Sequence, residues 1–386
     1  MSELLINGNA LSIPLADQSV QCVVTSPPYY GLRDYGTATW IGDDPECDHK
    51  IDNSKGVATS TLVGSKRNVS NALAGYKNAC AKCGAIRVDN QLGLEPTPEA
   101  YVENMVAVFR ELWRVLRDDG TAWLNIGDSY SGSGKGDNSN GKQGTNKGTR
   151  FDSPTSGYIS NGLKPKDLIG IPWRVAFALQ ADGWYLRSDI IWHKPNTMPE
   201  SVTDRPTKAH EYIFLLTKNA RYYYDHEAIM EPIAREWDDK NIGNKNRINT
   251  GAMTGIVLGR EKDPHCGLAN TLPNPKGRNK RSVWTVTTKP YRGAHFATYP
   301  PDLIVDCIKA GSKEGDVVFD PFAGSGTTLI VARKLKRHAI GLDLSMDYLT
   351  NNARERLGYN VLDKWTQNKP IGMTSESEPL FEVNNA

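Results

Sequence analysis

The 386-residue sequence is poor in the features that mark membrane or secreted proteins. No run of residues is long and apolar enough to span a bilayer, and the first residues form no charged-then-apolar leader, so we expect an intracellular, cytoplasmic protein. There are only six cysteines, which such a protein keeps as reduced thiols. The net charge is only +2, so the overall charge does not indicate a nucleic-acid partner.

The most informative motif is a glycine turn at residues 320–328, Asp-Pro-Phe-Ala-Gly-Ser-Gly-Thr-Thr. Residues 316–319 before it predict a strand, and residues 329–335 after it predict a helix. This order is typical of the first unit of a nucleotide-binding α/β sheet. A second predicted strand, 337–342, ends on Asp343, where an acid suits hydrogen bonds to ribose hydroxyls. The turn lacks the Gly-Lys-Ser/Thr ending of a phosphate loop, which disfavours ATP, and it departs from the Gly-x-Gly-x-x-Gly spacing.

A second motif follows an apolar predicted strand at residues 20–24 and reads Thr-Ser-Pro-Pro-Tyr-Tyr. Its two prolines remove two backbone donors and leave carbonyl groups that can accept hydrogen bonds. Ser26 adds a hydroxyl and Tyr29 an aromatic face. Such a turn can hold a planar amino group between acceptors and stack the ring that carries it. The alternative is that it is only a rigid turn.

Together the two motifs resemble those of the DNA amino-methyltransferases, which transfer a methyl group from S-adenosylmethionine (SAM) to an exocyclic nitrogen of a base. The catalytic turn precedes the SAM loop, as in the permuted β group, and residues 120–128, 189–196 and 295–301 resemble further segments of that family. The resemblance implies an α/β, Rossmann-like SAM-dependent methyltransferase fold. Its sheet is expected to be mostly parallel and circularly permuted, with a zinc-binding insertion and a target-recognition insertion.

The same resemblance assigns functional residues. Ser26, Pro27, Pro28 and Tyr29 would form the catalytic turn, in which the Ser26 hydroxyl and the Pro27 carbonyl accept hydrogen bonds from the target amino group. Tyr29 would stack on a base that has left the duplex. Asp343 would hold the ribose and Phe322 would lie near the sulfonium. The full set expected at the cofactor is Asp320, Pro321, Phe322, Gly324, Gly326, Thr327, Asp343, His295 and Pro300.

The residue before Pro-Pro-Tyr bears on the target base. Family members with Ser there mostly modify cytosine N4 and those with Asp mostly modify adenine N6, so Ser26 favours cytosine N4, with an adenine-N6 enzyme as the alternative. No Pro-Cys pair is present, which disfavours the covalent chemistry of cytosine-C5 enzymes. An RNA or small-molecule methyltransferase and a non-catalytic DNA-binding module are more distant alternatives. The expected partner is double-stranded DNA; a cognate restriction endonuclease is a further candidate, and no membrane partner is expected.

Charge is unevenly distributed along the chain. Residues 264–301 contain no acid, and six basic residues are interleaved there with Trp284, Tyr291, Phe296 and Tyr299. Such a composition suits phosphate contacts and base stacking, although a run of charge is more often a solvated loop. The residues predicted to contact DNA are Lys276, Arg278, Lys280, Arg281, Lys289 and Arg292.

Four of the metal-type ligands occur in two short groups. Cys80 and Cys83 form a Cys-x-x-Cys-Gly sequence typical of a zinc knuckle, and Cys47 with His49 supplies two further donors. We predict one structural zinc ion held by three thiolates and one imidazole. A redox pair is the alternative, but that motif normally opens a helix after a strand.

The remaining pattern sets the expected organisation. Apolar periodicity predicts a helix over 98–116 with Thr97 as its N-cap, a strand over 121–126, a helix over 167–179 and a strand over 212–216. The predicted parts are a catalytic first part at 1–36, the zinc-binding insertion at 37–90, a catalytic second part at 91–220 with a flexible loop at 131–150, a target-recognition region at 221–288, the SAM-binding part at 289–363 and a disordered tail at 364–386.

Overall fold

A computed structural model describes residues 2–31, 39–42, 46–47, 80, 82–88, 91–131, 163–164, 166–232, 277–289 and 299–358. Its contacts divide the chain into two compact units, one of Met1–Tyr224 with Ser282–Ala386 and one of Asp225–Arg281. The larger unit holds every strand named below. Among the described residues, no helix is long and apolar enough to cross a membrane.

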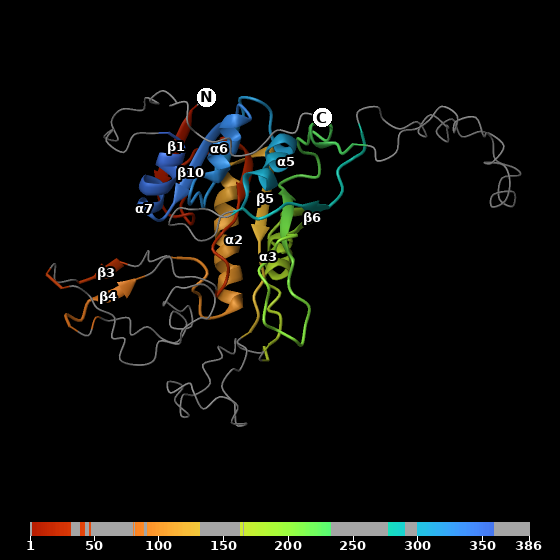
Figure 1. The fold of residues 1–386 in the computed structure, drawn as a ribbon. Coiled ribbons are helices and arrows are strands. Elements are labelled where there is room, and N and C mark those ends of the chain that lie inside the picture. Colours follow the sequence, from red (N-terminus) through yellow and green to blue (C-terminus); the bar gives the residue numbers. More distant parts are fainter. Residues whose placement is uncertain are drawn as a thin grey trace, which may run out of the picture. The chain divides into compact units, whose positions relative to one another are not determined.

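An eight-stranded sheet forms the centre of the larger unit (Figure 1), in the order β1-β10-β9-β2-β5-β7-β6-β8. The first five strands in this order are parallel, β7 runs antiparallel to both of its neighbours, and β8 is parallel to β6. The predicted, mostly parallel sheet is thus confirmed. The strands are β1 (Glu3–Asn7), β2 (Val20–Thr25), β5 (Leu116–Ile126), β6 (Tyr185–His193), β7 (His210–Thr217), β8 (Val283–Thr285), β9 (Val317–Asp320) and β10 (His338–Asp343). A separate antiparallel hairpin pairs β3 (Thr39–Ile41) with β4 (Ile86–Val88).

Strand β2 lies between β9 and β5, in parallel with both. All six of its residues are buried, as expected of a parallel strand covered on both faces. The register pairs Cys22 with Val318 and Val23 with Phe319. Because parallel strands end at the same edge of a sheet, the two sequence motifs, which follow β2 and β9, lie next to each other at that edge.

Helices cover both faces of this sheet. Along β5, Ala122 and Leu124 belong to the apolar cluster that contains α2 and α3, whereas Thr121 packs against Gly311 at the end of α5. Successive residues of a strand face opposite sides, so α2 and α3 cover one face and α5 covers the other. The helices are α2 (Pro98–Val115), α3 (Ile171–Ala181), α5 (Pro301–Gly311), α6 (Thr327–Lys334), α7 (Met346–Tyr348) and α8 (Arg354–Arg356), with a 3-10 turn at Glu227–Ile229 and a π turn at Leu349–Ala353.

Helix α2 matches the predicted helix closely. Thr97 accepts a hydrogen bond from the backbone N–H of Ala100 at 3.2 Å, which confirms it as the N-cap. The buried face includes Met105, Phe109 and Leu112, which recur at helical spacing. Trp184 packs edge-on against the ring of Phe109, with centroids 5.7 Å apart. The strand predicted at 121–126 begins earlier, at Leu116, directly after this helix.

Helix α3 begins four residues later than predicted. The sequence indicated a helix from Asp167, but the observed helix starts at Ile171. Leu168 instead pairs with Tyr130 in an antiparallel bridge, and Gly170 takes a left-handed conformation with φ of 78°. The carboxylate of Asp128 then accepts the N–H groups of Gly170 and Ile171, both at 3.0 Å. A carboxylate from a distant strand end therefore sets this N-terminus, which local periodicity could not reveal.

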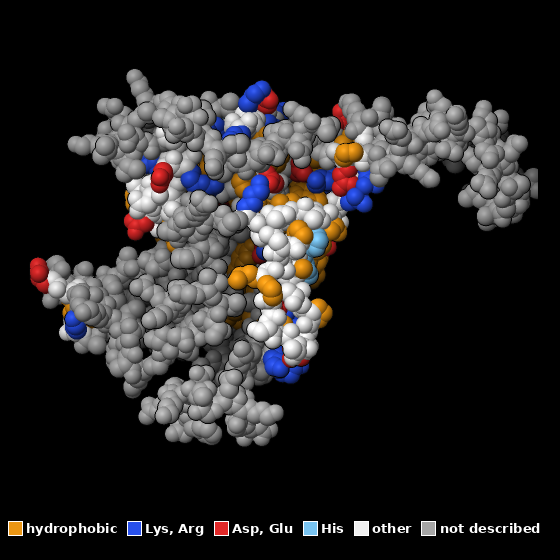
Figure 2. Space-filling view, viewed as in Figure 1, with side chains coloured by type: hydrophobic (Ala, Val, Ile, Leu, Met, Phe, Trp, Pro, Cys, Tyr) orange, Lys and Arg blue, Asp and Glu red, His pale blue; other side chains and the backbone are white. Residues whose placement is uncertain are grey.

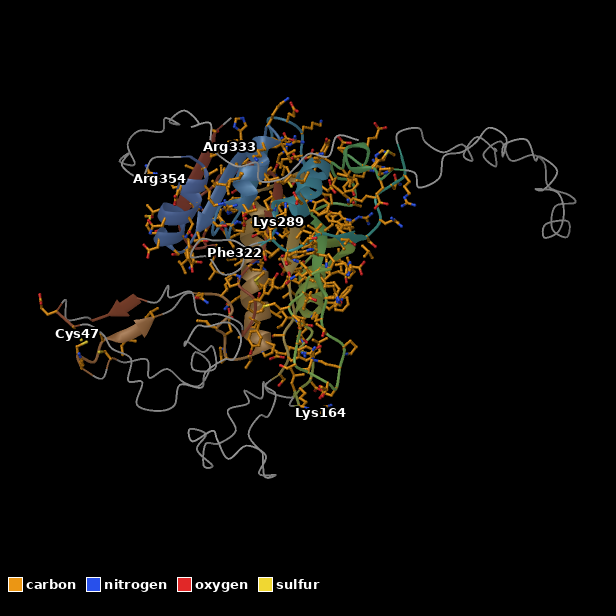
Figure 3. The ribbon with its side chains drawn as sticks, viewed as in Figure 1. Cys47, Lys164, Lys289, Phe322, Arg333 and Arg354 are labelled. Carbon is orange, nitrogen blue, oxygen red and sulfur yellow. The ribbon has the colours of Figure 1, made fainter. Side chains whose placement is uncertain are left out.

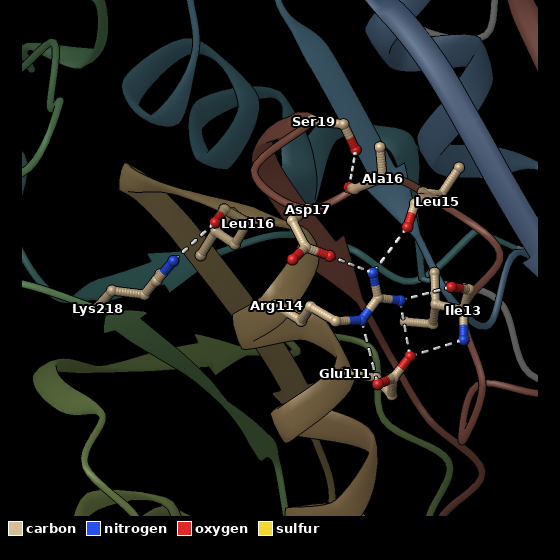
Figure 4. Close-up of polar contacts among 9 residues, drawn as sticks. All are labelled: Ile13, Leu15, Ala16, Asp17, Ser19, Glu111, Arg114, Leu116 and Lys218. Atoms are coloured by element: carbon tan, nitrogen blue, oxygen red, sulfur yellow. Dashed lines mark hydrogen bonds and ion pairs between the residues drawn. The ribbon is translucent and has the colours of Figure 1, made fainter.

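Arg114, in the last turn of α2, fixes the segment that leads into β2 (Figure 4). Its guanidinium donates to the carbonyls of Ile13 at 2.7 Å and Leu15 at 2.8 Å. It also forms ion pairs with Asp17 at 2.7 Å and Glu111 at 2.9 Å. One cation thus ties four groups together, and these contacts anchor the chain just before the strand that carries the predicted catalytic turn.

Gly341, in β10, is packed so closely that its mutation should test the fold near the glycine turn. A Cβ atom there would lie 2.8 Å from the Ala323 side chain and 2.8 Å from Leu329. We expect Gly341→Ala to lower the free energy of unfolding by about 1–3 kcal/mol, measured by urea denaturation, because of overpacking. Gly8→Ala is the matched control, because its Cβ would meet Leu342 at an ordinary 3.4 Å. Equal stability of the two variants would contradict the packing argument.

Candidate active site

The two turns line one cavity of about 700 Å³ at the carboxyl edge of the sheet. On one side lie all four residues of the predicted catalytic turn, and on the other the turn between β9 and α6, where Figure 3 labels Phe322. Gly326 and Pro300 are not among the described residues that line it, and His295 lies outside the described part of the chain. The predicted residues that do line it are Ser26, Pro27, Pro28, Tyr29, Asp320, Pro321, Phe322, Gly324, Thr327 and Asp343.

A buried carboxylate joins the two turns. Asp320 is 2% exposed, and its Oδ1 accepts hydrogen bonds from the Thr25 hydroxyl at 2.7 Å and the Phe322 backbone N–H at 3.0 Å. Its Oδ2 accepts from the hydroxyls of Thr328 at 2.5 Å and Tyr299 at 3.1 Å. Burial raises the pKa of the Asp320 carboxyl, and the four donated hydrogen bonds oppose that rise. The carboxylate expected to face the cofactor is thus occupied by the protein itself.

The glycine turn is shaped by a second carboxylate, that of Asp343 at the end of β10. Its Oδ2 accepts the Gly324 N–H and its Oδ1 the Ser345 N–H, both at 2.8 Å. Gly326 has a φ of 76° and forms the N-cap of α6, a conformation that favours glycine. Burial is the main reason that the pKa of Asp343 rises to about 6. Each carboxylate oxygen retains a lone pair, so this group can still accept a donor from the cavity.

The side chain of Tyr29 is held from two directions. Its hydroxyl donates to Glu211 at 2.7 Å and lies 3.1 Å from the Asn125 side-chain oxygen. Its ring packs against Gly127, where a Cβ would come within 2.5 Å of the ring. Glu211 also forms an ion pair with Lys194. Burial, and next the negative charge of Glu211, raise the pKa of Tyr29 well above its ordinary value, so it remains a hydrogen-bond donor.

Hydrogen bonds also hold the backbone of the predicted catalytic turn. The Tyr101 hydroxyl, from α2, donates to the Pro28 carbonyl at 2.9 Å. Gly93 approaches the turn from the other side, and its carbonyl accepts the N–H of Gly31 at 2.9 Å. The Ser26 hydroxyl lies 3.4 Å from that of Tyr29 and lines the cavity. The turn is therefore braced by two neighbouring segments while its serine faces the open space.

Several residues of the site were not predicted from the sequence. They contact predicted residues or the partners of predicted residues, and they are Thr25, Asn125, Lys194 and Glu211. Asn125 and Lys194 lie in segments 120–128 and 189–196, for which the sequence predicts strands of the family and no site residue. Glu211 had no local signal, because it is an ordinary acid at the start of a strand. The antiparallel pairing of β7 with β5 is what brings it to the cavity.

The basic segment is more neutralised than its composition indicates. Glu231 forms ion pairs with Arg278 at 3.1 Å and Arg281 at 2.9 Å, and Lys289 pairs with Asp302 at 2.7 Å. Figure 2 likewise shows basic and acidic side chains next to each other on the face that it draws. Lys280 is half-buried, whereas Lys276 and Arg292 lie outside the described residues. The role of these side chains on DNA stays a prediction.

The aromatic part of that prediction needs a correction. Trp284 is only 6% exposed and its ring lies 6.5 Å from that of Trp123, so it belongs to the protein core and offers no face to a base. Tyr299 donates to Asp320 and contacts Thr328. Tyr291 and Phe296 lie outside the described residues. The prediction that Trp284 stacks on a base is therefore wrong, because Trp284 is the central residue of β8 and is buried.

Comparisons with known proteins found one matching family and several similar proteins. A model of the DNA methylase family that comprises N6 and N4 enzymes matches residues 20–377. The type II methyltransferase M.Cfr9I of Citrobacter freundii is 40% identical over 349 residues, 89% of this chain and 84% of that protein. M.XycI of Xanthomonas campestris pv. cyanopsidis is 39% identical over 360 residues, which cover 92% of this chain and 88% of that protein. Among solved structures, the PvuII DNA methyltransferase (cytosine-N4-specific) aligns with a TM-score of 0.48 and 13% identity, over 91% of this chain and 84% of that one.

The four hydrogen bonds to Asp320 lead to a stability prediction. We expect Asp320→Ala to lower the free energy of unfolding by at least about 3 kcal/mol, because it leaves several buried donors without an acceptor. Thr25→Val removes one donor only and should cost about 1 kcal/mol. Urea denaturation of both variants measures the difference. If Asp320→Ala were no more destabilising than Thr25→Val, the carboxylate would not be the link between the two turns.

Proposed function

The chain belongs to the DNA methylase family of N6 and N4 enzymes, and from that premise we propose that it transfers a methyl group from SAM to the exocyclic N4 of cytosine in duplex DNA. One observation carries the proposal: the serine-proline turn and the glycine turn line the same cavity. Its volume of about 700 Å³ is that of a typical site for small molecules. A methyl donor and an acceptor base bound on its two sides would meet inside it.

The cofactor side would be formed by the glycine turn. Asp343 retains acceptor capacity for ribose hydroxyls, and the turn allows a ligand to approach the backbone. Phe322 lines the same wall and would contact the cofactor near its sulfonium. SAM supplies an activated methyl group when it is bound. Asp320 acts here through its neighbours, because its carboxylate holds the turn in shape while it is itself buried.

The base side would be formed by the catalytic turn. The lone pair of an exocyclic amine is delocalised into the ring, so the base is a weak nucleophile. Hydrogen bonds from the amino group to the Ser26 hydroxyl and the Pro27 carbonyl would hold the nitrogen in line with the methyl group. Tyr29 would present its ring to a base flipped out of the duplex, since the amine is otherwise unreachable. The contacts of Tyr29 with Glu211 and Gly127 keep that ring in one orientation.

The choice of cytosine N4 rests on Ser26. Both amino groups require the same acceptors, so the distinction from adenine N6 depends on the residue before Pro-Pro-Tyr and on pocket shape. DNA as the substrate is supported by the family and by type II methyltransferases among the relatives. The second compact unit, Asp225–Arg281, falls within the predicted recognition region at 221–288, and we propose that it reads the target sequence.

The direct test is mass spectrometry of nucleosides from duplex DNA incubated with the protein and isotopically labelled SAM. We expect label in N4-methylcytosine. We also expect Ser26→Ala to lower turnover at least about 100-fold with unchanged SAM affinity, because the lost contact acts on the amino group. Ser19→Ala, whose hydroxyl donates to the Ala16 carbonyl away from the cavity, is the matched control and should keep full turnover.

Other outcomes of this assay are equally informative. Label in N6-methyladenine would overturn the base assignment and leave the site as proposed. Full turnover by Ser26→Ala would remove its hydroxyl from the mechanism. No label in DNA made from many random sequences, together with measurable SAM binding, would contradict the choice of duplex DNA as the substrate.

The pKa of Asp343 predicts how SAM binding depends on pH. The value of about 6 lies above the ordinary one, so the buried carboxylate is ionised at pH 7 at a cost in stability that is relieved as pH falls below 6. The ionised carboxylate accepts hydrogen bonds from ribose hydroxyls more strongly than the protonated carboxyl group does. The Kd for SAM should therefore rise about tenfold between pH 7 and pH 5. Isothermal titration calorimetry measures this Kd. Asp343→Asn should bind SAM weakly and with no dependence on pH. Asp347→Asn is the control: its side chain is exposed, so its SAM binding should depend on pH as that of the wild type does.

A further inference from the structure

Three cysteines from two distant parts of the sequence meet at one point. The sulfur atoms of Cys47, Cys80 and Cys83 all lie within 4.8 Å of one another, although 33 positions separate the first two residues. Figure 3 labels Cys47 beside the β3–β4 hairpin, and β4 begins three residues after Cys83. This cluster is separate from the cavity described above, because none of its members lines that cavity.

The spacing of the sulfur atoms indicates a shared cation. Cys47 and Cys80 are 3.8 Å apart, sulfur to sulfur, far beyond the disulfide bond length of about 2.05 Å. Four thiolates placed tetrahedrally around Zn²⁺, each about 2.3 Å away, have sulfur atoms about 3.8 Å from one another. The observed distance therefore equals one edge of such a tetrahedron. Cys83 completes a triangle whose sulfur atoms all lie within 4.8 Å of one another.

The backbone around Cys80 has the form of a metal-binding knuckle. Cys80 and Ala85 are joined by an N–H to carbonyl hydrogen bond of 2.7 Å, and Gly84 donates to the Cys80 carbonyl at 2.9 Å. Gly84 has a φ of 77°, which glycine adopts without strain. The Lys82 N–H donates to the Cys80 sulfur at 3.4 Å. Cys80 itself is 4% exposed, so a metal bound there would be shielded from water on that side.

We propose that Cys47, Cys80 and Cys83 are three ligands of a structural Zn²⁺ site. Soft thiolates select zinc over magnesium or calcium, and a closed tetrahedral shell leaves no position for a substrate. Each thiol releases its proton when the metal binds, so zinc uptake liberates protons and needs no oxidant. His49, two residues after Cys47 in the sequence, is the candidate for the fourth ligand and lies outside the described residues.

The site has a clear structural task. It would tie Cys47, which follows β3, to Cys80 and Cys83, which precede β4, and the chain that leaves β4 leads to Gln91 and Leu92, which line the cavity. The next residue, Gly93, contacts the backbone of the catalytic turn. A metal fixed at this point would add a link between the two ends of the cluster that the hairpin hydrogen bonds alone do not provide. The site does not depend on the proposed methyl transfer.

The test is the metal content of the full-length protein after exhaustive dialysis against metal-free buffer. Inductively coupled plasma mass spectrometry should find about one zinc per chain, and Cys83→Ser should hold less than a tenth of that amount. Cys266→Ser is the matched control and should retain the full amount, because Cys266 belongs to neither half of the cluster. His49→Ala should also lose zinc if the imidazole is the fourth ligand. If His49→Ala kept its zinc, another group would be the fourth ligand and the three cysteine ligands would stand.

A second measurement avoids variants that fail to fold. Wild-type protein in which Co²⁺ replaces the native metal should show the intense charge-transfer absorption of three thiolate ligands and the visible bands of tetrahedral cobalt. An octahedral spectrum without charge transfer, iron in place of zinc, or full zinc retention by Cys83→Ser would each overturn the proposal. None of these readouts uses methyl transfer, so they separate a failure of this site from a failure of the proposed function.

Discussion

The arrangement of the site depends on the hydrogen bonds that the buried carboxylate of Asp320 accepts. It accepts hydrogen bonds from Thr25 at the end of β2, from Tyr299 before α5, from Thr328 in α6 and from the turn itself. A charge buried this deeply is unfavourable unless such donors surround it, so the four segments are held together by the need to satisfy one group. The contact between Thr25 and Asp320 spans 295 positions and fixes the two halves of the site to each other.

The two carboxylates, those of Asp320 and Asp343, differ in how many hydrogen bonds each accepts from the protein. Asp320 has a full complement of donors from the protein and therefore serves structure. Asp343 receives two backbone N–H groups from the described residues, so its carboxylate keeps lone pairs for a ligand in the cavity that both acids line. Sequence position does not separate these roles, because both acids end a strand in the same βαβ unit. Their neighbours in space decide which of them keeps acceptor capacity for a cofactor.

Charges are balanced locally within each of the two compact units. Glu211 pairs with Lys194 and orients Tyr29, and Glu231 takes up two arginines of the basic segment. Binding of DNA phosphates by those arginines would require exchange of one anionic partner for another, which costs less than desolvating an isolated cation. A basic sequence therefore gives an upper limit on the charge available to DNA, since folding can supply acids from elsewhere in the chain.

Much of this protein could be predicted from its sequence: the α/β sheet, helix α2 with its Thr97 cap, the glycine turn and the serine-proline turn all have local signatures in spacing and residue type. The start of α3, the burial of Trp284 and the partners Glu211 and Thr25 had none. These depend on strand order and register, which are set by contacts between residues far apart in the chain. The sequence determined which chemical groups are available; only the tertiary structure decided which of them meet, because proximity at the sheet edge comes from packing and not from spacing along the chain.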